Sequence, residues 1–234
     1  MSEWRILIEP PRSAREHMTR DEALALEGMP TVRLFVWDPP AVSLGFKQMA
    51  PDWCEAWRWR GAGLECVERP TGGGIALHGS DVCCSVVVPR EMGLKLEPLM
   101  RAVCQSAVEL CKSYGVTARL LLEDDAKERI TYCLIQRSAY AVYSGERKLA
   151  GFALRRYPGS WLIQGSLLVQ PLPRALTDAM PAIVIEQLNQ QAVSLSEAAG
   201  TPISFSNVTH RWAEGFSTWW NGIVADVELV SDAV

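Results

Sequence analysis

The chain has 234 residues, of which 48% are hydrophobic and 21% charged, a composition typical of a folded protein. Its net charge of −4 provides no excess of positive charge that would attract a nucleic acid. No apolar run approaches the roughly 18 residues of a membrane span, and the amino terminus lacks a secretory signal. We therefore expect one cytoplasmic domain over residues 1–234, with neither nucleic acid nor membrane as a partner.

The first part of the chain alternates short apolar runs with one clear helix signal. Ser13 followed by Glu16 is a capping box, which predicts a helix that ends near Glu27. A tryptophan-rich segment predicts a short helix from Pro51 to Arg60. Apolar runs and turn residues predict strands at Trp4–Glu9, Thr31–Trp37 and Ala41–Leu44.

Residues 67–88 form the most informative stretch. An apolar run ends at Arg69, a Pro-Thr-Gly-Gly-Gly turn follows, and a second apolar run spans Val82–Val88, which predicts strand, glycine-rich loop, strand. Three consecutive glycines are costly to order. Without Cβ atoms, however, their N–H groups can line a concavity for carbonyl or phosphate oxygens. A flexible hairpin loop is the alternative, and the donors of Arg69 and His78 on either side favour a binding loop.

The second part of the chain continues the mixture of helices and strands. The apolar stripe of Leu96–Tyr114 predicts a helix that buries Cys104 and Cys111, which makes them poor nucleophiles. A hairpin is predicted to turn at Ser144 and Gly145. Further elements are predicted as strands at Val116–Leu122, Trp161–Val169 and Ala225–Leu229, helices at Ile183–Leu195 and Val208–Ile223, and a charged loop at Glu123–Arg129. The order of elements predicts an α/β (α+β) fold with a mixed, largely antiparallel sheet flanked by helices.

The seven cysteines are an odd number and include no Cys-x-x-Cys pair. This pattern argues against a disulfide framework and against a zinc site, so no metal is expected and most thiols should be reduced and buried. Cys133 differs, because it lies in no clear apolar stripe. Arg129, Arg137 and Lys148 are close to it in sequence, and positive charge of this kind stabilises a nucleophilic thiolate.

Three segments together resemble the lipoate/octanoate and biotin protein ligase family. Arg69 to His78 closely resembles its signature Arg-x-(Ser/Thr)-Gly-Gly-Gly-(Ala/Ile)-x-x-His. Residues 42–48, Val-Ser-Leu-Gly-Phe-Lys-Gln, resemble a strand and Gly-x-x-Gln segment beside the acyl pocket. Residues 145–153 resemble Gly-x-(Arg/Lys)-Lys-(Ile/Val/Leu)-x-Gly-x-Ala, whose lysine faces the acyl carbonyl. The resemblance implies the mixed-sheet fold of the biotin/lipoate protein ligase catalytic domain over nearly the whole chain.

The resemblance also implies site residues. One branch of octanoyltransferases in the family carries a catalytic cysteine about fifteen residues before the lysine, and Cys133, Ser138 and Tyr140 approximately match its context. Lys148 would then stabilise the oxygen of the tetrahedral intermediate. Cys133 and Lys148 are thus the implied catalytic residues. The implied substrate-binding residues are Gln48, Arg69, Gly72, Gly73, Gly74, His78, Gly151, Ala153 and Gly165.

This reading implies an acyltransferase of protein lipoylation. An octanoyl or lipoyl group would pass from acyl carrier protein to Cys133, and then to a lysine of a lipoyl-carrier protein, such as the glycine-cleavage H protein or an E2 lipoyl domain. No metal or cofactor is needed on this route. The sequence departs from the branch at Leu134, at the Gly-Phe-Ala-Leu after Lys148, and at Gln164, where family members often carry histidine.

Two alternatives remain open at this point. An AMP-forming lipoate ligase would use free lipoate, ATP and magnesium, with Lys148 against carbonyl and phosphate and Cys133 dispensable. The Asn-Asp-(Leu/Ile) that such ligases carry near this position is absent. The other alternative is a non-catalytic module that binds a lipoyl carrier, with Cys133 as a buried structural residue.

Overall fold

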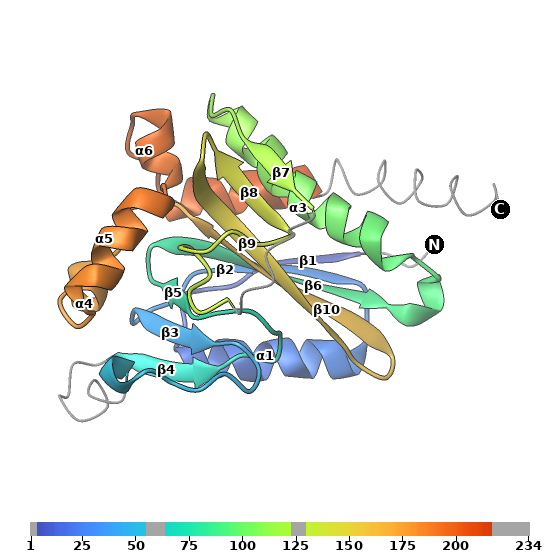
Figure 1. Ribbon diagram of the computed structural model, residues 1–234. Coiled ribbons are helices and arrows are strands. Elements are labelled where there is room, and N and C mark those ends of the chain that lie inside the picture. The colour runs from blue at the N-terminus through green and yellow to red at the C-terminus, as the bar shows by residue number, and fades with distance from the viewer. Residues whose placement is uncertain (1–3, 55–63, 123–129, 217–234) are drawn as a thin grey trace.

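The computed structural model describes residues 4–54, 64–122 and 130–216. Its main feature is a seven-stranded sheet in the order β1-β2-β6-β10-β9-β8-β7 (Figure 1). Only β1 and β2 pair in parallel, and all the other neighbours are antiparallel, so the mixed and largely antiparallel sheet is confirmed. The strands are β1 (Arg5–Ile8), β2 (Thr31–Phe35), β6 (Asp81–Pro89), β7 (Arg119–Leu121), β8 (Ala141–Ser144), β9 (Arg147–Arg156) and β10 (Ser160–Leu168).

A second, three-stranded sheet carries the glycine loop. It consists of β4 (Glu65–Glu68), β3 (Ala41–Leu44) and β5 (Ala76–His78), with β3 in the middle. The predicted strand at Val82–Val88 is confirmed as β6, but the prediction missed β5, which forms before it because residues 76–78 pair with β3. The chain then turns at Gly79, whose φ of +114° favours glycine, before it enters β6. The loop thus joins the two outer strands of the small sheet.

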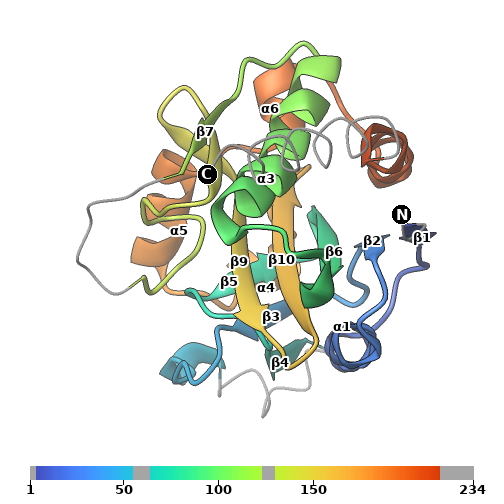
Figure 2. The ribbon, with the colours of Figure 1, turned by 90° about the vertical axis from the view of Figure 1, so that its right-hand side faces the viewer.

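Helices cover both faces of the main sheet. α1 (Ala14–Glu27) begins at the predicted capping box of Ser13 and Glu16 and ends at Gly28. α3 (Leu96–Ser113) also follows the prediction. Figure 2 shows α1 and the small sheet on one side of the main sheet and α3 on the other. A helix over residues 205–216 packs with α3, where Trp212 donates to Ser106 Oγ at 3.0 Å.

The predicted helix Ile183–Leu195 is wrong in its length. The structure has two helices there, α5 (Ala182–Gln191) and α6 (Leu195–Ala199). Ala192 is extended, and the Val193 N–H donates to the Lys148 carbonyl of β9 at 3.0 Å. Ser194 then starts α6 with a capping box of its own. Two short elements had no sequence signal, namely η1 (Arg90–Met92) and α4 (Arg174–Thr177).

The remaining differences are at the ends of elements. β7 is shorter than the predicted strand, and the last helix begins at residue 205 instead of Val208. The predicted strand at 225–229, the charged loop at 123–129 and most of the helix at 51–60 lie outside the described residues. Of the helices that are described, none is both long enough and apolar enough to cross a membrane.

Candidate active site

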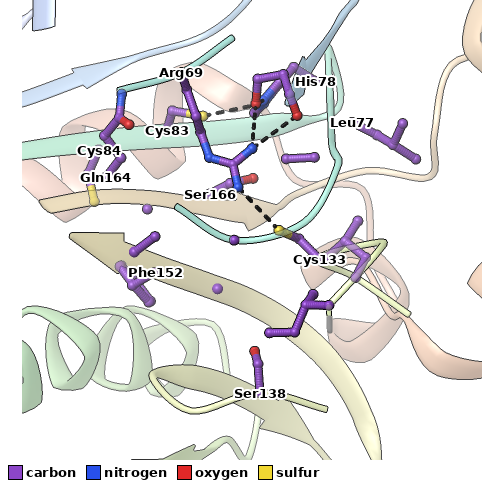
Figure 3. A pocket seen from close by; sticks show the side chains of 18 of the residues that line it. Arg69, Leu77, His78, Cys83, Cys84, Cys133, Ser138, Phe152, Gln164 and Ser166 are labelled. Atoms are coloured by element: carbon purple, nitrogen blue, oxygen red, sulfur yellow. Dashed lines mark hydrogen bonds between the residues drawn. The ribbon is translucent and has the colours of Figure 1, made fainter. Parts of the chain in front are cut away.

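A cavity of about 120 Å³ lies between the main sheet and the small sheet. Its lining comes from α1, from β2, β3, β5, β6, β9 and β10, from the glycine loop and from the segment 130–139 (Figure 3). Much of the wall is apolar, with Met18, Phe35, Trp37, Leu77, Leu134 and Phe152. Eight of the residues predicted for the site also line it, namely Arg69, Gly73, His78, Cys133, Lys148, Gly151, Ala153 and Gly165.

Backbone conformation accounts for one glycine of the loop, and a close backbone contact accounts for another. Gly73 has a φ of +98°, a conformation that other residues rarely adopt. A Cβ on Gly74 would lie 2.7 Å from the Thr131 carbonyl oxygen. A Cβ on Gly72 would meet nothing within 4 Å. Gly45, at the end of β3, packs so tightly that a Cβ there would lie 2.0 Å from the Gly73 oxygen.

The Arg69 side chain holds this loop from inside the protein. It is 7% exposed, and its Nη2 donates to the carbonyl oxygens of Gly72 and Gly74 at 2.8 and 2.7 Å. The same nitrogen lies 3.6 Å from Cys133 Sγ. The Nη1 atom donates to Ser43. The guanidinium therefore fixes the loop and also faces the sulfur.

Cys133 is half-buried and lies against the glycine loop. Its N–H donates to the Ile75 carbonyl at 2.8 Å, and the Ile75 N–H donates to the Thr131 carbonyl at 2.7 Å. This short parallel bridge places Sγ 3.2 Å from the Gly74 carbonyl oxygen, to which the thiol donates. The contact joins segments 59 residues apart.

Most of the other described thiols are buried and unsuited to nucleophilic attack. Burial raises the pKa of Cys111 to about 12, and it also raises the pKa values of Cys84 and Cys104. Burial and the Asp81 carboxylate together raise the pKa of Cys83, although its side chain lines the cavity. Cys133 is the described thiol that is both half-buried and part of the cavity wall.

Lys148 reaches the cavity from β9 and is only 2% exposed. Its Nζ donates to Ser138 Oγ at 2.6 Å and to the Gln136 carbonyl at 3.2 Å. A Cβ on Gly151 would lie 3.7 Å from Nζ, so the glycine leaves the neighbourhood of the ammonium free of a side chain. The lysine is thus held by the segment that follows Cys133.

His78 forms part of the cavity wall through contacts that occupy both ring nitrogens. Nδ1 donates to Asp81 Oδ2 at 2.7 Å, and Nε2 lies 2.7 Å from Ser43 Oγ. Burial opposes ionisation of Asp81, but His78 and the donors Ser166 and Cys83 outweigh it and lower the carboxyl pKa. Within the described residues, His78, Asp81 and Cys83 are the one group with metal-binding atoms close together. Because the carboxylate already accepts hydrogen bonds from both partners, they form a closed polar cluster.

Gln48 does not line the cavity, although it was predicted to bind substrate. Its Oε1 accepts from the Gly45 N–H at 3.0 Å, and its Nε2 donates to the Thr131 carbonyl at 3.1 Å. It therefore ties the end of β3 to the segment that carries Cys133. Gly72 and Gly74 likewise lie behind the lining and contribute carbonyls to Arg69.

A buried polar network without a local sequence signal also supports the loop. Thr71 donates to Gln164 Oε1 at 2.7 Å, and Gln164 Nε2 donates to Asp21 at 2.6 Å. Asp21 in turn accepts from Arg33 and Ser85. Thr71 and Gln164 are 93 residues apart, so no local pattern could have paired them.

The arrangement suits chemistry on an acyl group. The apolar cavity can hold a short acyl chain, with its carbonyl near the Cys133 thiol. Lys148 and the loop can supply donors to a developing oxyanion. Gly73 lines the cavity, and its amide N–H makes no hydrogen bond to any residue within the described ranges, so it is available for this purpose.

Comparison with known proteins agrees with this geometry. The model of the lipoyl protein ligase A/B catalytic domain matches residues 13–217. Octanoyltransferase LipM of Kyrpidia tusciae is 32% identical, over 93% of this chain and 87% of that protein. Octanoyltransferase LipM of Symbiobacterium thermophilum is also 32% identical, over 92% and 85%.

Solved structures show the same fold. A lipoate-protein ligase A bound with ATP has a TM-score of 0.74 at 21% identity, covering 94% of this chain and 86% of that chain. A bipartite lipoate protein ligase from Thermoplasma acidophilum, studied with its E2 lipoyl domain, has a TM-score of 0.70 at 19% identity, covering 94% and 85%. The predicted ligase catalytic-domain fold is therefore confirmed, and the chain belongs to the lipoyl protein ligase A/B catalytic domain family.

Proposed function

We propose that the protein is an acyltransferase of protein lipoylation that moves an octanoyl group from acyl carrier protein to a lysine of a lipoyl-carrier protein. The observation that carries the proposal is the half-buried Cys133 thiol, which lies against the glycine loop in a cavity that Lys148 also lines. The names of the two octanoyltransferase relatives support the same reaction. Such an enzyme would work in the cytoplasm.

In the first step the Cys133 thiolate attacks the carbonyl carbon of the octanoyl thioester. A bond from Sγ to this carbon forms, the bond from the carbon to the carrier's sulfur breaks, and the carrier thiol leaves with a proton. Lys148 and the Gly73 amide donate hydrogen bonds to the oxygen as it becomes negative. Gly151, Ala153 and Gly165 line the wall beside the acyl chain.

In the second step a neutral lysine amine of the lipoyl carrier attacks the thioester on Cys133. The carbon–nitrogen bond forms and the carbon–sulfur bond breaks, and the proton lost by the amine restores the thiol. The E2 lipoyl domain studied with the Thermoplasma ligase illustrates the class of acceptor, and an H protein is the other candidate. No cofactor takes part in either step.

The test is covalent capture of the intermediate. Incubation with octanoyl acyl carrier protein should add the mass of one octanoyl group to the intact protein. The adduct should be lost in Cys133→Ser and kept in Cys66→Ser, which removes the other half-buried thiol. Transfer to a lipoyl domain should then discharge the adduct.

Two results would contradict the proposal. An unmodified mass together with ATP- and magnesium-dependent pyrophosphate release on adding lipoate would identify a ligase, the chemistry of the ATP-bound neighbour. Retained carrier binding with neither signal would identify a binding module. In both cases Cys133→Ser would behave like the wild type.

A further inference from the structure

The two terminal nitrogens of Arg69 donate to protein atoms. Nη1 donates to the backbone oxygen and the Oγ of Ser43 at 3.0 and 3.2 Å. Nη2 donates to the Gly72 and Gly74 carbonyls. It also faces Cys133 Sγ (Figure 3). Both terminal nitrogens are therefore occupied. For Arg69 to bind the acyl carbonyl through them, it would first have to release the glycine loop.

The Cys133 thiol and Arg69 share one acceptor. The thiol donates to the Gly74 carbonyl oxygen at 3.2 Å, and Arg69 Nη2 donates to the same oxygen at 2.7 Å. When the thiol loses its proton to solvent, its hydrogen bond disappears and a negative sulfur faces a carbonyl oxygen. Repulsion from that oxygen would disfavour the thiolate unless a positive charge lies nearby.

Arg69 supplies that charge. Its Nη2 is 3.6 Å from Sγ, a distance at which a guanidinium strongly attracts a negative sulfur. The effect is larger here than at an open surface, because Arg69 is buried and Cys133 half-buried. Lys148 Nζ donates to Ser138 Oγ at 2.6 Å and to the Gln136 carbonyl at 3.2 Å.

We propose that Arg69 is a catalytic residue that stabilises the Cys133 thiolate, and that it does not bind the acyl carbonyl. The inference deepens the proposed function, on which it rests for the role of the thiolate as nucleophile. A lysine at this position could not replace the arginine, since one ammonium cannot reach Ser43, both loop carbonyls and the sulfur together.

The test measures the reactivity of the thiol without any acyl donor. Wild type and Arg69→Gln are treated with iodoacetamide at pH 7, and alkylation of each cysteine is followed by peptide mass spectrometry. Alkylation of Cys133 should be at least about tenfold slower in Arg69→Gln, because the thiolate is the reacting form. The half-buried Cys66 serves as the internal reference.

Arg155→Gln is the matched control. Arg155 Nη1 donates to the Pro70 carbonyl of the same loop at 3.0 Å, and the residue does not line the cavity. Its loss removes one positive charge beside the loop and should change Cys133 alkylation by less than about twofold. Buried Cys54 and Cys83 report folding, and both should stay unreactive in each variant.

Wild-type or faster alkylation of Cys133 in Arg69→Gln, with the buried thiols protected, would overturn the proposal. If Cys54 and Cys83 become reactive in Arg69→Gln, the Arg69→Ala variant is used for the test instead. Millimolar guanidinium chloride should then speed Cys133 alkylation several-fold over equal sodium chloride, and equal rates would overturn the inference. Because no acyl donor is used, failure of wild type to form an acyl-enzyme would count against the proposed function and leave the Arg69 result standing.

Discussion

Replacing Gly45 by alanine tests whether the position of the glycine loop controls activity. The new Cβ would lie 2.0 Å from the Gly73 carbonyl oxygen, whereas an ordinary contact needs about 3.4 Å. The position of the alanine Cβ is fixed by the backbone, and the Gly73 oxygen is itself a backbone atom, so no rotamer change can relieve the clash. The loop must therefore move by more than about 1 Å. Gly73 lies beside Arg69 and Cys133, and a shift of about 1 Å in positioned groups costs about a hundredfold in rate.

The assay is the rate of octanoyl-enzyme formation, followed by intact mass, together with thermal unfolding. Gly45→Ala should lose about a hundredfold in rate, and overpacking by about 1–3 kcal/mol should lower Tm by several degrees. Gly72→Ala is the matched comparison, in the loop that Gly45 contacts, since its Cβ would meet nothing within 4 Å. The Gly72→Ala variant should lose far less of the rate of octanoyl-enzyme formation. Equal rates for the two variants would refute the argument that this contact positions the loop.

Three other outcomes follow from contacts near the site. Lys148→Ala should slow octanoyl-enzyme formation by about a hundredfold, since a charged donor to the oxyanion is removed. Gly165→Ala should lower the free energy of unfolding in urea by about 1–3 kcal/mol, because its Cβ would lie 2.3 Å from the Phe152 ring, and Phe152→Leu should restore most of it. Burial and the Arg33 charge lower the pKa of His17 to about 4, so the unfolded chain binds more protons between about pH 4 and 6.5. Stability should fall by up to about 3 kcal/mol as the pH drops through this window, and His17→Gln should flatten the decline.

Each of these outcomes has a result that would count against it. If Lys148→Ala is acylated as fast as wild type, the lysine does not stabilise the oxyanion. A Gly165→Ala variant that Phe152→Leu leaves as unstable as before would show that the ring contact is not the cause. Unchanged pH dependence in His17→Gln would show that other groups produce the decline.

Local signals predicted the parts of the fold whose cause lies within a few residues. The capping box of Ser13 and Glu16 set the start of α1, and the apolar stripe of Leu96–Tyr114 set α3. These features depend on helix geometry over one or two turns. Two of the errors have the opposite origin. Val193 leaves the helix pattern because its N–H bonds to β9, and residues 76–78 join the small sheet because β3 lies beside them.

The candidate site divides in the same way. The sequence alone predicted the glycine loop, the importance of Cys133 and Lys148, and the family that these segments resemble. These predictions were possible because the segments are short motifs with their own chemistry. The tertiary structure alone decided that the Cys133 sulfur lies on the Gly74 carbonyl, that Arg69 faces this sulfur, and that Lys148 is buried. Contacts between segments some 60 residues apart depend on strand pairing and packing between two sheets, which no local pattern encodes.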